Sequence, residues 1–247
     1  RRVRRGHRAR TPARRGGGAS ARAAAARAAS GALFVDGRRP AAEGMLVEPG
    51  TDRVEVRGEM VVPSEKNSYI ALNNPEGYIT TASDPGSRPT VNELLTATGR
   101  VFPIGRLDMD SRGLLLLTDD GELANRLAHP RCHVAKEYLA LVDGVPGESD
   151  LRKLREGVQL EDRKTAPAEV EVVGSVRGHT QVRLTIREGR NRQVRRMLEA
   201  VGHPVRDLKR TAFGPLRLGR RKAGAWARPG RPGVARRLGN SSARVTA

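Results

Sequence analysis

The segment with the clearest chemical potential is GRLDMDSRG, residues 105–113. It places the basic Arg106 two positions before the carboxylate of Asp108, in a stretch bounded by glycines. The apolar run Leu114–Leu117 follows directly and predicts a strand buried on both faces. Loops beside buried strands are common positions for catalytic groups, so Asp108 is a candidate. Taken alone, however, the pattern favours an ordinary turn.

A second candidate is the basic segment Arg183–Arg210, which holds nine basic residues against three acidic ones. Apolar residues at helical spacing predict a helix whose buried face consists of Val194, Met197, Leu198 and Val201. Three arginines share another face near the start of this helix: Arg192, Arg195 and Arg196. A helix N-terminus flanked by arginines is a good anion site. A solvated basic face explains the same residues equally well.

The elements that would hold these segments alternate between strand and helix. Strands are predicted at 69–72, 114–117, 138–142 and 182–186, and helices after Thr90 and at 122–128, 151–156 and 194–201. Gly202 and Pro204 predict the end of the last helix. This alternation indicates an α+β domain built on a mixed sheet.

A smaller unit precedes that domain. Residues 19–29 have helix propensity, residues 32–35 predict a strand, and Asp36-Gly37 is a turn signal. Residues 53–57 alternate polar and apolar and predict a half-buried strand. Residues 63–67 look like the link to the main domain. A helix and hairpin of this size can bury little core of their own.

The composition limits the class of protein. Of the 247 residues, 37% are hydrophobic and 3% aromatic, so the core depends on aliphatic side chains. The sequence contains no apolar run long enough to span a bilayer, which favours a cytoplasmic protein without a membrane partner. Cys132 is the single cysteine and the five histidines lack ligand spacing, so neither a disulfide framework nor a metal site is expected.

The net charge of +19 is concentrated at the two ends of the sequence. Residues 1–30 and 217–247 contain many arginines and no acid, whereas residues 31–216 hold 27 basic and 27 acidic residues. Basic segments of this kind attract polyanions, so nucleic acid is the expected partner. A genome that encodes Arg and Ala freely is the alternative explanation for the charge.

The residues from 105 onward closely resemble a known family signature. The sequence GRLDMDSRGLLLLTDDGELANRLAHP resembles that of bacterial ribosomal RNA pseudouridine synthases of the RsuA/RluB family, and GELANRLAHP resembles the large-subunit RluB-type branch. Three further segments resemble other family motifs in the same order: YIALNNPEGYITTASDPGSRPTVNELL, AKEYLALVDG and VRLTIREGRNRQVRRMLEAVGHPVRDLKRTAFGPLRLG. Asn74 departs from the lysine that the family often has before its proline.

The resemblance implies a function and a set of site residues. It implies an isomerase that converts a uridine of ribosomal RNA, expected in the 23S molecule, to pseudouridine without a metal or cofactor. Asp108 would be the catalytic carboxylate, supported by Arg106, Tyr138 and Arg195, and Arg195 would pair with Asp108. RNA contacts are expected from four further residues, Lys136, Arg190, Arg192 and Arg196. A non-catalytic RNA-binding or ribosome-assembly protein is the alternative.

The resemblance also implies a domain organisation. A pseudouridine synthase fold with a mixed, mostly antiparallel central sheet is expected at residues 67–219. The segment FVDGRRPAAEGMLVEPGTDRVEVRG resembles the alpha-L RNA-binding motif, which predicts such a module at residues 19–62, incomplete because its usual leucine-rich first helix is replaced. Residues 1–18 and 220–247 are expected to be basic tails, and the protein is expected to be a monomer.

Overall fold

The computed structural model describes residues 30–40, 51–60, 67–81, 84, 86–95, 98–99 and 101–229. The chain divides into two units, residues 1–67 with 119–121 and residues 68–118 with 122–247. The helix expected at residues 19–29, the tail 1–18 and most of the tail 220–247 lie outside the described residues.

The smaller unit contains a three-stranded antiparallel sheet. β1 (Leu33–Val35) pairs with β2 (Val54–Val56), which pairs with β3 (Glu59–Met60). The predicted turn follows β1, because Asp36 and Gly37 adopt left-handed φ angles of 50° and 72° that allow a tight two-residue reversal. The residues Leu33, Val35 and Val54 are buried together as a small core.

The larger unit is built on a nine-stranded sheet with the order β12-β4-β6-β10-β7-β9-β8, in which β5 also pairs with β6 and β11 with β10. Its strands are β4 (Tyr69–Asn74), β5 (Phe102–Ile104), β6 (Arg112–Thr118), β7 (Lys136–Val142), β8 (Glu169–Val176), β9 (His179–Ile186), β10 (Val205–Phe213), β11 (Leu216–Arg217) and β12 (Trp226–Ala227). Strands β6 and β10 run parallel, whereas the other pairs are antiparallel. The expected mixed, mostly antiparallel sheet is confirmed.

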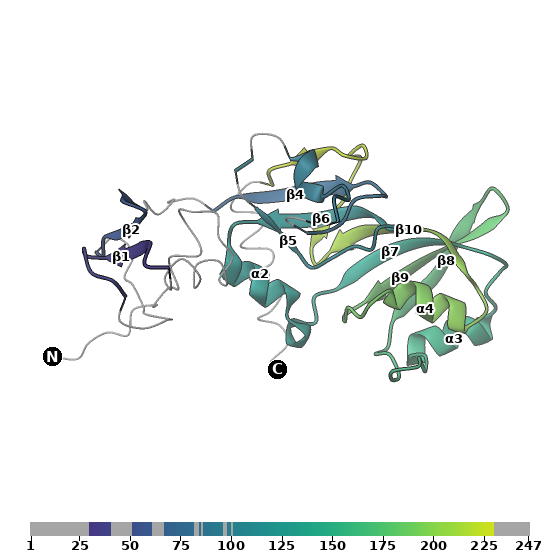
Figure 1. Ribbon diagram of the computed structural model, residues 1–247. Helices are drawn as coiled ribbons and strands as arrows, with labels where there is room; N and C mark the ends of the chain where they lie inside the picture. The colour runs from purple at the N-terminus through teal and green to yellow at the C-terminus, as the bar shows by residue number, and fades with distance from the viewer. Residues whose placement is uncertain are drawn as a thin grey trace. The chain divides into compact units, whose positions relative to one another are not determined.

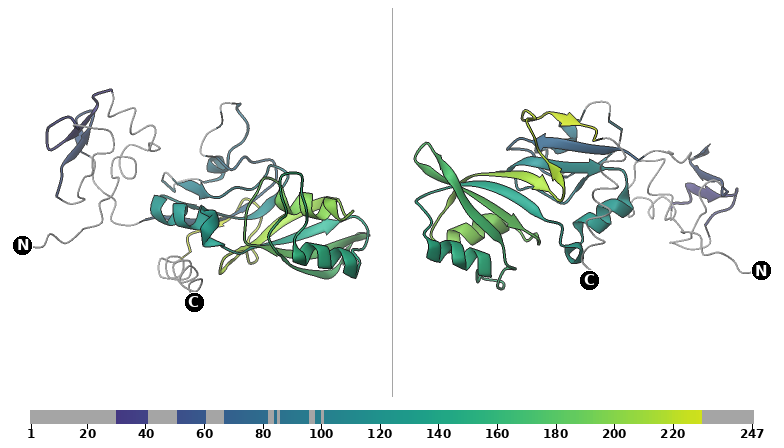
Figure 2. Two further views of the ribbon diagram at one scale, coloured as in Figure 1. Left: turned by 90° about the horizontal axis from the view of Figure 1, so that it is seen from below. Right: turned by 180° about the vertical axis from the view of Figure 1, so that it is seen from behind.

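Both faces of this sheet are covered, as alternate residues of β4 illustrate. Ile70 and Leu72 belong to the core cluster under α3 (Glu148–Glu156) and α4 (Gln193–Ala200), and Tyr69 and Ala71 belong to the cluster under α2 (Gly121–Ala128). Figures 1 and 2 show α3 and α4 beside each other on one side of the curved sheet. The continuous apolar runs in β4 and β6 follow from this two-sided burial.

The predicted strands and helices of the larger unit are present, with one difference in type. The helix expected after Thr90 is a single 3-10 turn, η1 (Val91–Leu94), capped by Glu93, whose carboxylate accepts a hydrogen bond of 2.7 Å from the Thr90 N–H. A second such turn, η2 (Pro130–Cys132), follows α2 where Pro130 was expected to end it. Strands β5, β8, β10, β11 and β12 were not predicted.

Within the described part of the chain, no helix has the length and apolar character needed to cross a membrane. The same residues contain no group of three or more His, Cys, Asp or Glu side chains placed to hold a metal ion.

Candidate active site

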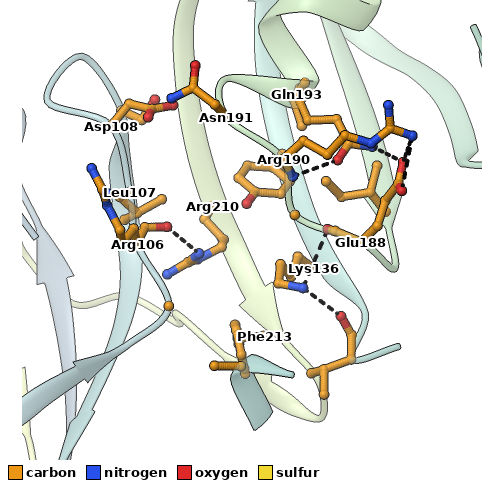
Figure 3. Close-up of a pocket in the computed structure, with 18 of the residues that line it drawn as sticks. Arg106, Leu107, Asp108, Lys136, Glu188, Arg190, Asn191, Gln193, Arg210 and Phe213 are labelled. Carbon is orange, nitrogen blue, oxygen red and sulfur yellow. Dashed lines mark hydrogen bonds and ion pairs between the residues drawn. The ribbon is translucent and has the colours of Figure 1, made fainter. Parts of the chain in front are cut away.

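A cavity of about 360 Å³ lies in the larger unit between four segments. Its walls are the turn around Asp108, the end of α2 with η2, the loop from β9 to α4, and the paired strands β7 and β10 (Figure 3). Residues of both candidate segments line it, among them Arg106, Asp108, Arg190, Asn191, Arg192 and Arg210, together with Lys136 and Tyr138 of β7. The fold therefore brings the two segments to one cavity.

The turn that carries Asp108 is fixed through its backbone. The Leu107 N–H donates to Thr80 Oγ1 at 2.9 Å, and Thr80 Oγ1 donates to the Leu107 carbonyl at 2.5 Å. The Ser111 N–H donates to the Asp108 carbonyl at 2.9 Å and closes the turn. The Asp108 side chain itself is partly exposed and lines the cavity. Because the backbone around this carboxylate is already ordered, binding a ligand costs little further backbone entropy.

Arg195 does not pair with Asp108, although the family resemblance implied that it would. Its guanidinium contacts Asp110 instead: Nε lies 3.2 Å from the carboxylate, and Nη2 donates to the Asp110 carbonyl at 2.5 Å. The turn directs the two carboxylates differently. Asp108 lines the cavity, whereas Asp110 lies outside the lining and contacts Arg192 and Arg195 at the start of α4.

Arg210 is the buried cation of the site, and the sequence analysis did not select it. Its side chain is 1% exposed, and it donates through Nε to the Leu114 carbonyl at 2.7 Å and through Nη1 to the Arg106 carbonyl at 3.2 Å. Its Nη2 has no hydrogen-bond partner within the described structure. A buried donor of this kind is rare because it has lost water without gaining an acceptor. The cavity beside it could supply one.

Lys136 also lies in the cavity rather than on the surface. Its Nζ lies 3.2 Å from the Val134 carbonyl and 3.5 Å from the Glu188 carbonyl. Burial, together with repulsion from Arg210, lowers the pKa of Lys136 to about 8, against a weaker opposing effect of Glu188. Lys136 and Arg210 approach the Phe213 ring to 5.7 and 5.5 Å from its centroid, within cation–π range.

The loop between β9 and α4 is tied to itself and to residues 162–166. Glu188 accepts hydrogen bonds from the Ala166 N–H at 3.0 Å and from Gln193 Nε2 at 2.5 Å. Arg190, whose side chain is 12% exposed, donates to the Lys164 carbonyl at 2.7 Å and lies 3.3 Å from Asp162. The Arg190 guanidinium therefore connects the loop to residues 162–164 and holds it in place.

The remaining predicted residues lie at different depths. Tyr138 is 9% exposed, lines the cavity, and stands opposite Arg210 in the β7–β10 pair. Arg106 is exposed at the cavity. Arg192 is exposed at the start of α4 in a left-handed conformation with φ 47°. Arg196 lies outside the lining and pairs with Asp162 at 2.6 Å.

Arg210 and Asn191 are among the lining residues that the sequence analysis did not select. Arg210 occupies an inward-pointing position two residues after the buried Leu208, and this alternation becomes visible only once residues 205–213 are treated as a strand. Asn191 belongs to the quoted motif but had no assigned role, and Figure 3 places its side chain next to Asp108.

Chemically, the cavity combines a carboxylate on its wall with cations and a tyrosine. Its volume falls in the range of small-ligand sites, and its charged groups include Asp108, Arg106, Lys136 and Arg210. Such a site suits a planar, polar ligand attached to an anionic chain, with the carboxylate available for nucleophilic or base chemistry.

Comparisons with known proteins show the family to which the chain belongs. Residues 68–200 match the family described as RNA pseudouridylate synthase. Ribosomal large subunit pseudouridine synthase B of Bacillus subtilis is 46% identical over 172 residues, covering 68% of this chain and 70% of that protein. An uncharacterised RNA pseudouridine synthase of Aquifex aeolicus is 43% identical over 198 residues, covering 79% of each chain.

A solved structure is also similar. The crystal structure of a pseudouridylate synthase superimposes with a TM-score of 0.66 at 28% identity, covering 90% of this chain and 94% of that one. The chain has the pseudouridine synthase fold and belongs to the RNA pseudouridylate synthase family, whose members are isomerases.

Proposed function

We propose that this protein is a ribosomal RNA pseudouridine synthase that isomerises one uridine of large-subunit RNA, with Asp108 as its catalytic carboxylate. The names of relatives such as ribosomal large subunit pseudouridine synthase B support the substrate class. The observation that carries the assignment of Asp108 is its place on the wall of the cavity, where Thr80 and Ser111 fix the backbone around it.

The reaction breaks the bond between the sugar C1′ and N1 of uracil and forms a bond between C1′ and C5 of the same base. The proton on C5 is lost and N1 gains one, so atoms and electrons balance without an oxidant. Asp108 either attacks C1′ or removes a proton from the neighbouring sugar carbon, and both routes need an ionised carboxylate at the sugar. The target uridine must leave its stack first, at a cost of a few kcal/mol.

The other cavity residues then have separate roles. Tyr138 stacks on the uracil, and Arg106, exposed at the mouth of the cavity, occupies the position that the flipped nucleotide leaves. Arg210 offers its unpartnered Nη2 to an oxygen inside the cavity. Arg195 supports the site through Asp110, to which it is bound.

RNA contacts divide by exposure. Arg192 at the cavity rim contacts phosphate directly, and Lys136 contacts the nucleotide inside the cavity. Arg190 and Arg196 contribute charge next to the RNA while they hold Asp162. The basic residues of 1–30 and 217–247 add phosphate contacts without sequence choice.

The finer organisation belongs to the same proposal. Residues 19–62 form an alpha-L-like RNA-binding module, to which the three strands β1–β3 would contribute. Residues 67–219 are the catalytic domain between the basic tails 1–18 and 220–247. The protein acts as a monomer in the cytoplasm.

The substitution Asp108→Asn tests the proposal because it removes the charge and preserves the shape. The purified variant should form no pseudouridine on large-subunit RNA fragments, detected by carbodiimide labelling and primer extension, and should bind RNA about as well as wild type. Asp143→Asn is the control, because Asp143 is an ion-paired carboxylate outside the cavity lining. Substantial turnover by the Asp108 variant would refute the assignment, and pseudouridine formed only in small-subunit RNA would refute the substrate.

A further inference from the structure

Asp110 is a second carboxylate of the Asp108 turn, and two arginines near the start of α4 contact it. Arg192 Nη2 donates to its Oδ2 at 2.7 Å, and Arg195 Nε lies 3.2 Å from the same oxygen. Arg195 Nη2 also donates to the Asp110 backbone carbonyl at 2.5 Å. The contact therefore fixes the backbone of the turn as well as a side chain.

Arg195 is itself held in place. Its side chain is 11% exposed, and its Nη1 donates to the carbonyl of Val205, the first residue of β10, at 3.0 Å. One guanidinium thus joins the turn, α4 and the sheet. Since the planar guanidinium has its donors in a fixed arrangement, a shift of Asp110 would break several contacts together.

The position of Asp110 in the turn transmits this constraint to Asp108. The hydrogen bond from the Ser111 N–H to the Asp108 carbonyl, 2.9 Å long, encloses Met109 and Asp110 between its two ends. On the other side, Thr80 fixes Leu107. Asp108 therefore lies between two anchors, and Asp110 is the anchor toward α4.

Asp110 remains ionised in this setting. Burial raises the pKa of Asp110, but the hydrogen bond from Arg192 and the charges of Arg195 and Arg192 outweigh burial, so the pKa lies below its ordinary value. The contacts are consequently intact throughout the neutral range. An exposed ion pair contributes little on its own, so the importance of Asp110 should lie in the geometry that it imposes rather than in stability.

We propose that Asp110, which forms ion pairs with Arg192 and Arg195, is a positioning residue that orients the Asp108 carboxylate toward the sugar of the bound nucleotide. The inference rests on the proposed role of Asp108 and extends it to a residue outside the cavity lining. The same contacts connect the turn to Arg192 at the cavity rim, where phosphate would bind.

The test compares Asp110→Ala and Asp110→Asn with wild type in the full chain. Asp143→Ala is the matched control, because the Asp143 carboxylate also contacts two basic side chains, Arg206 at 2.6 Å and His179 at 3.0 Å, and lies outside the cavity lining. Each protein is assayed for the single-turnover rate at saturating RNA, the Kd for RNA and the melting temperature.

Misplacement of a reacting group by about 1 Å can reduce a rate on the order of 100-fold, so Asp110→Ala should lower the saturated rate by about 10-fold to 100-fold. Its Kd and melting temperature should stay close to those of wild type. Asp110→Asn, which keeps the shape and the acceptor oxygen, should recover part of the rate. Asp143→Ala should keep the wild-type rate.

Three outcomes would overturn the inference: a wild-type rate in Asp110→Ala, a loss confined to Kd, or an equal loss of rate in Asp143→Ala. If Asp110→Ala fails to fold, the isosteric Asp110→Asn tests the inference in its place. An Asn variant with the full wild-type rate would refute a role for the ion pairs of Asp110. Failure of the proposed function looks different, because the wild-type protein would then form no pseudouridine at all.

Discussion

Thr80 Oγ1 accepts a hydrogen bond from the backbone N–H of Leu107 and donates one to the carbonyl of the same residue. A single hydroxyl thereby satisfies both backbone groups of a residue that is 6% exposed and directly precedes Asp108. Thr80 is itself 5% exposed, so water is poorly placed to substitute for it.

Thr80→Val should therefore damage both stability and catalysis. The isosteric change leaves the buried amide and carbonyl of Leu107 without their partner, at a cost of about 1–3 kcal/mol. Chemical unfolding measures that loss, and the single-turnover rate should fall because the Asp108 turn loosens. Thr80→Ser, which retains the hydroxyl, should restore most of both. A valine variant with the wild-type rate would show that this anchor does not control Asp108.

Gly113→Ala should be severely destabilising. Gly113 has a φ of 111°, and a Cβ there would lie 2.3 Å from the Arg210 carbonyl oxygen and 2.7 Å from the Arg210 nitrogen. Both atoms are backbone of the paired strand, so β6 and β10 would have to separate, at a cost of about 3–5 kcal/mol.

Gly219→Ala is the matched control for Gly113→Ala. Gly219 also has a positive φ, 65°, but a Cβ there meets nothing within 4 Å. It should show only the left-handed strain of about 1–2 kcal/mol. Equal unfolding midpoints for the two variants would mean that the close approach of β6 and β10 is relieved elsewhere.

Arg210→Met should separate activity from stability. Removing the buried charge relieves its desolvation, whereas the Leu114 carbonyl loses its donor, so the net change in unfolding free energy should stay within about 2 kcal/mol. Activity should nevertheless fall sharply, because the cavity loses the unpartnered Nη2 donor. The two measurements are thermal melting and single-turnover rate, and a fully active variant would exclude Arg210 from the chemistry.

Lys136 should make stability depend on pH. Its pKa in the folded protein is about 8, below the ordinary value of 10.5, so between these values the unfolded chain binds more protons and stability rises with pH. At neutral pH, Lys136→Met should be more stable than wild type by at most about 3 kcal/mol, and the difference should shrink as pH rises from 8 toward 10.5.

Chemical unfolding across that pH window measures the effect of Lys136. Lys153→Met controls for removal of a surface charge, because the Lys153 side chain is 65% exposed. A difference between Lys136→Met and wild type that does not vary with pH would contradict burial of a charged amine.

Local patterns predicted much of the fold because burial imposes them on the sequence. The run Leu114–Leu117 is apolar at every position since both faces of β6 are covered, and Val194, Met197 and Leu198 recur at helical spacing since one side of α4 meets the sheet. Strand β10 was not predicted because its sequence, VRDLKRTAF, places a buried arginine where an apolar residue is usual.

The site residues were predicted through resemblance more than through physics, and the pairing of Arg195 with Asp108 is the part that the structure contradicts. Position in sequence selected Asp108 and Arg195, but which carboxylate meets Arg195 depends on the direction of each side chain in a tight turn. That direction is set by long-range contacts, such as the bond from Arg195 to Val205 and those from Thr80 to Leu107. The effect of burial on Lys136 likewise depends on neighbours distant in sequence.

The parallel pairing of β6 with β10 has a consequence for the newly made chain. Lys209 aligns with Arg112, so the two walls of the cavity are separated by about a hundred residues of sequence. Protein synthesis adds ~5–20 residues per second, so Asp108 exists for several seconds before its opposite wall has been synthesised. During that interval the nascent protein has a carboxylate without a cavity. The cavity is therefore completed only after β10 has been synthesised.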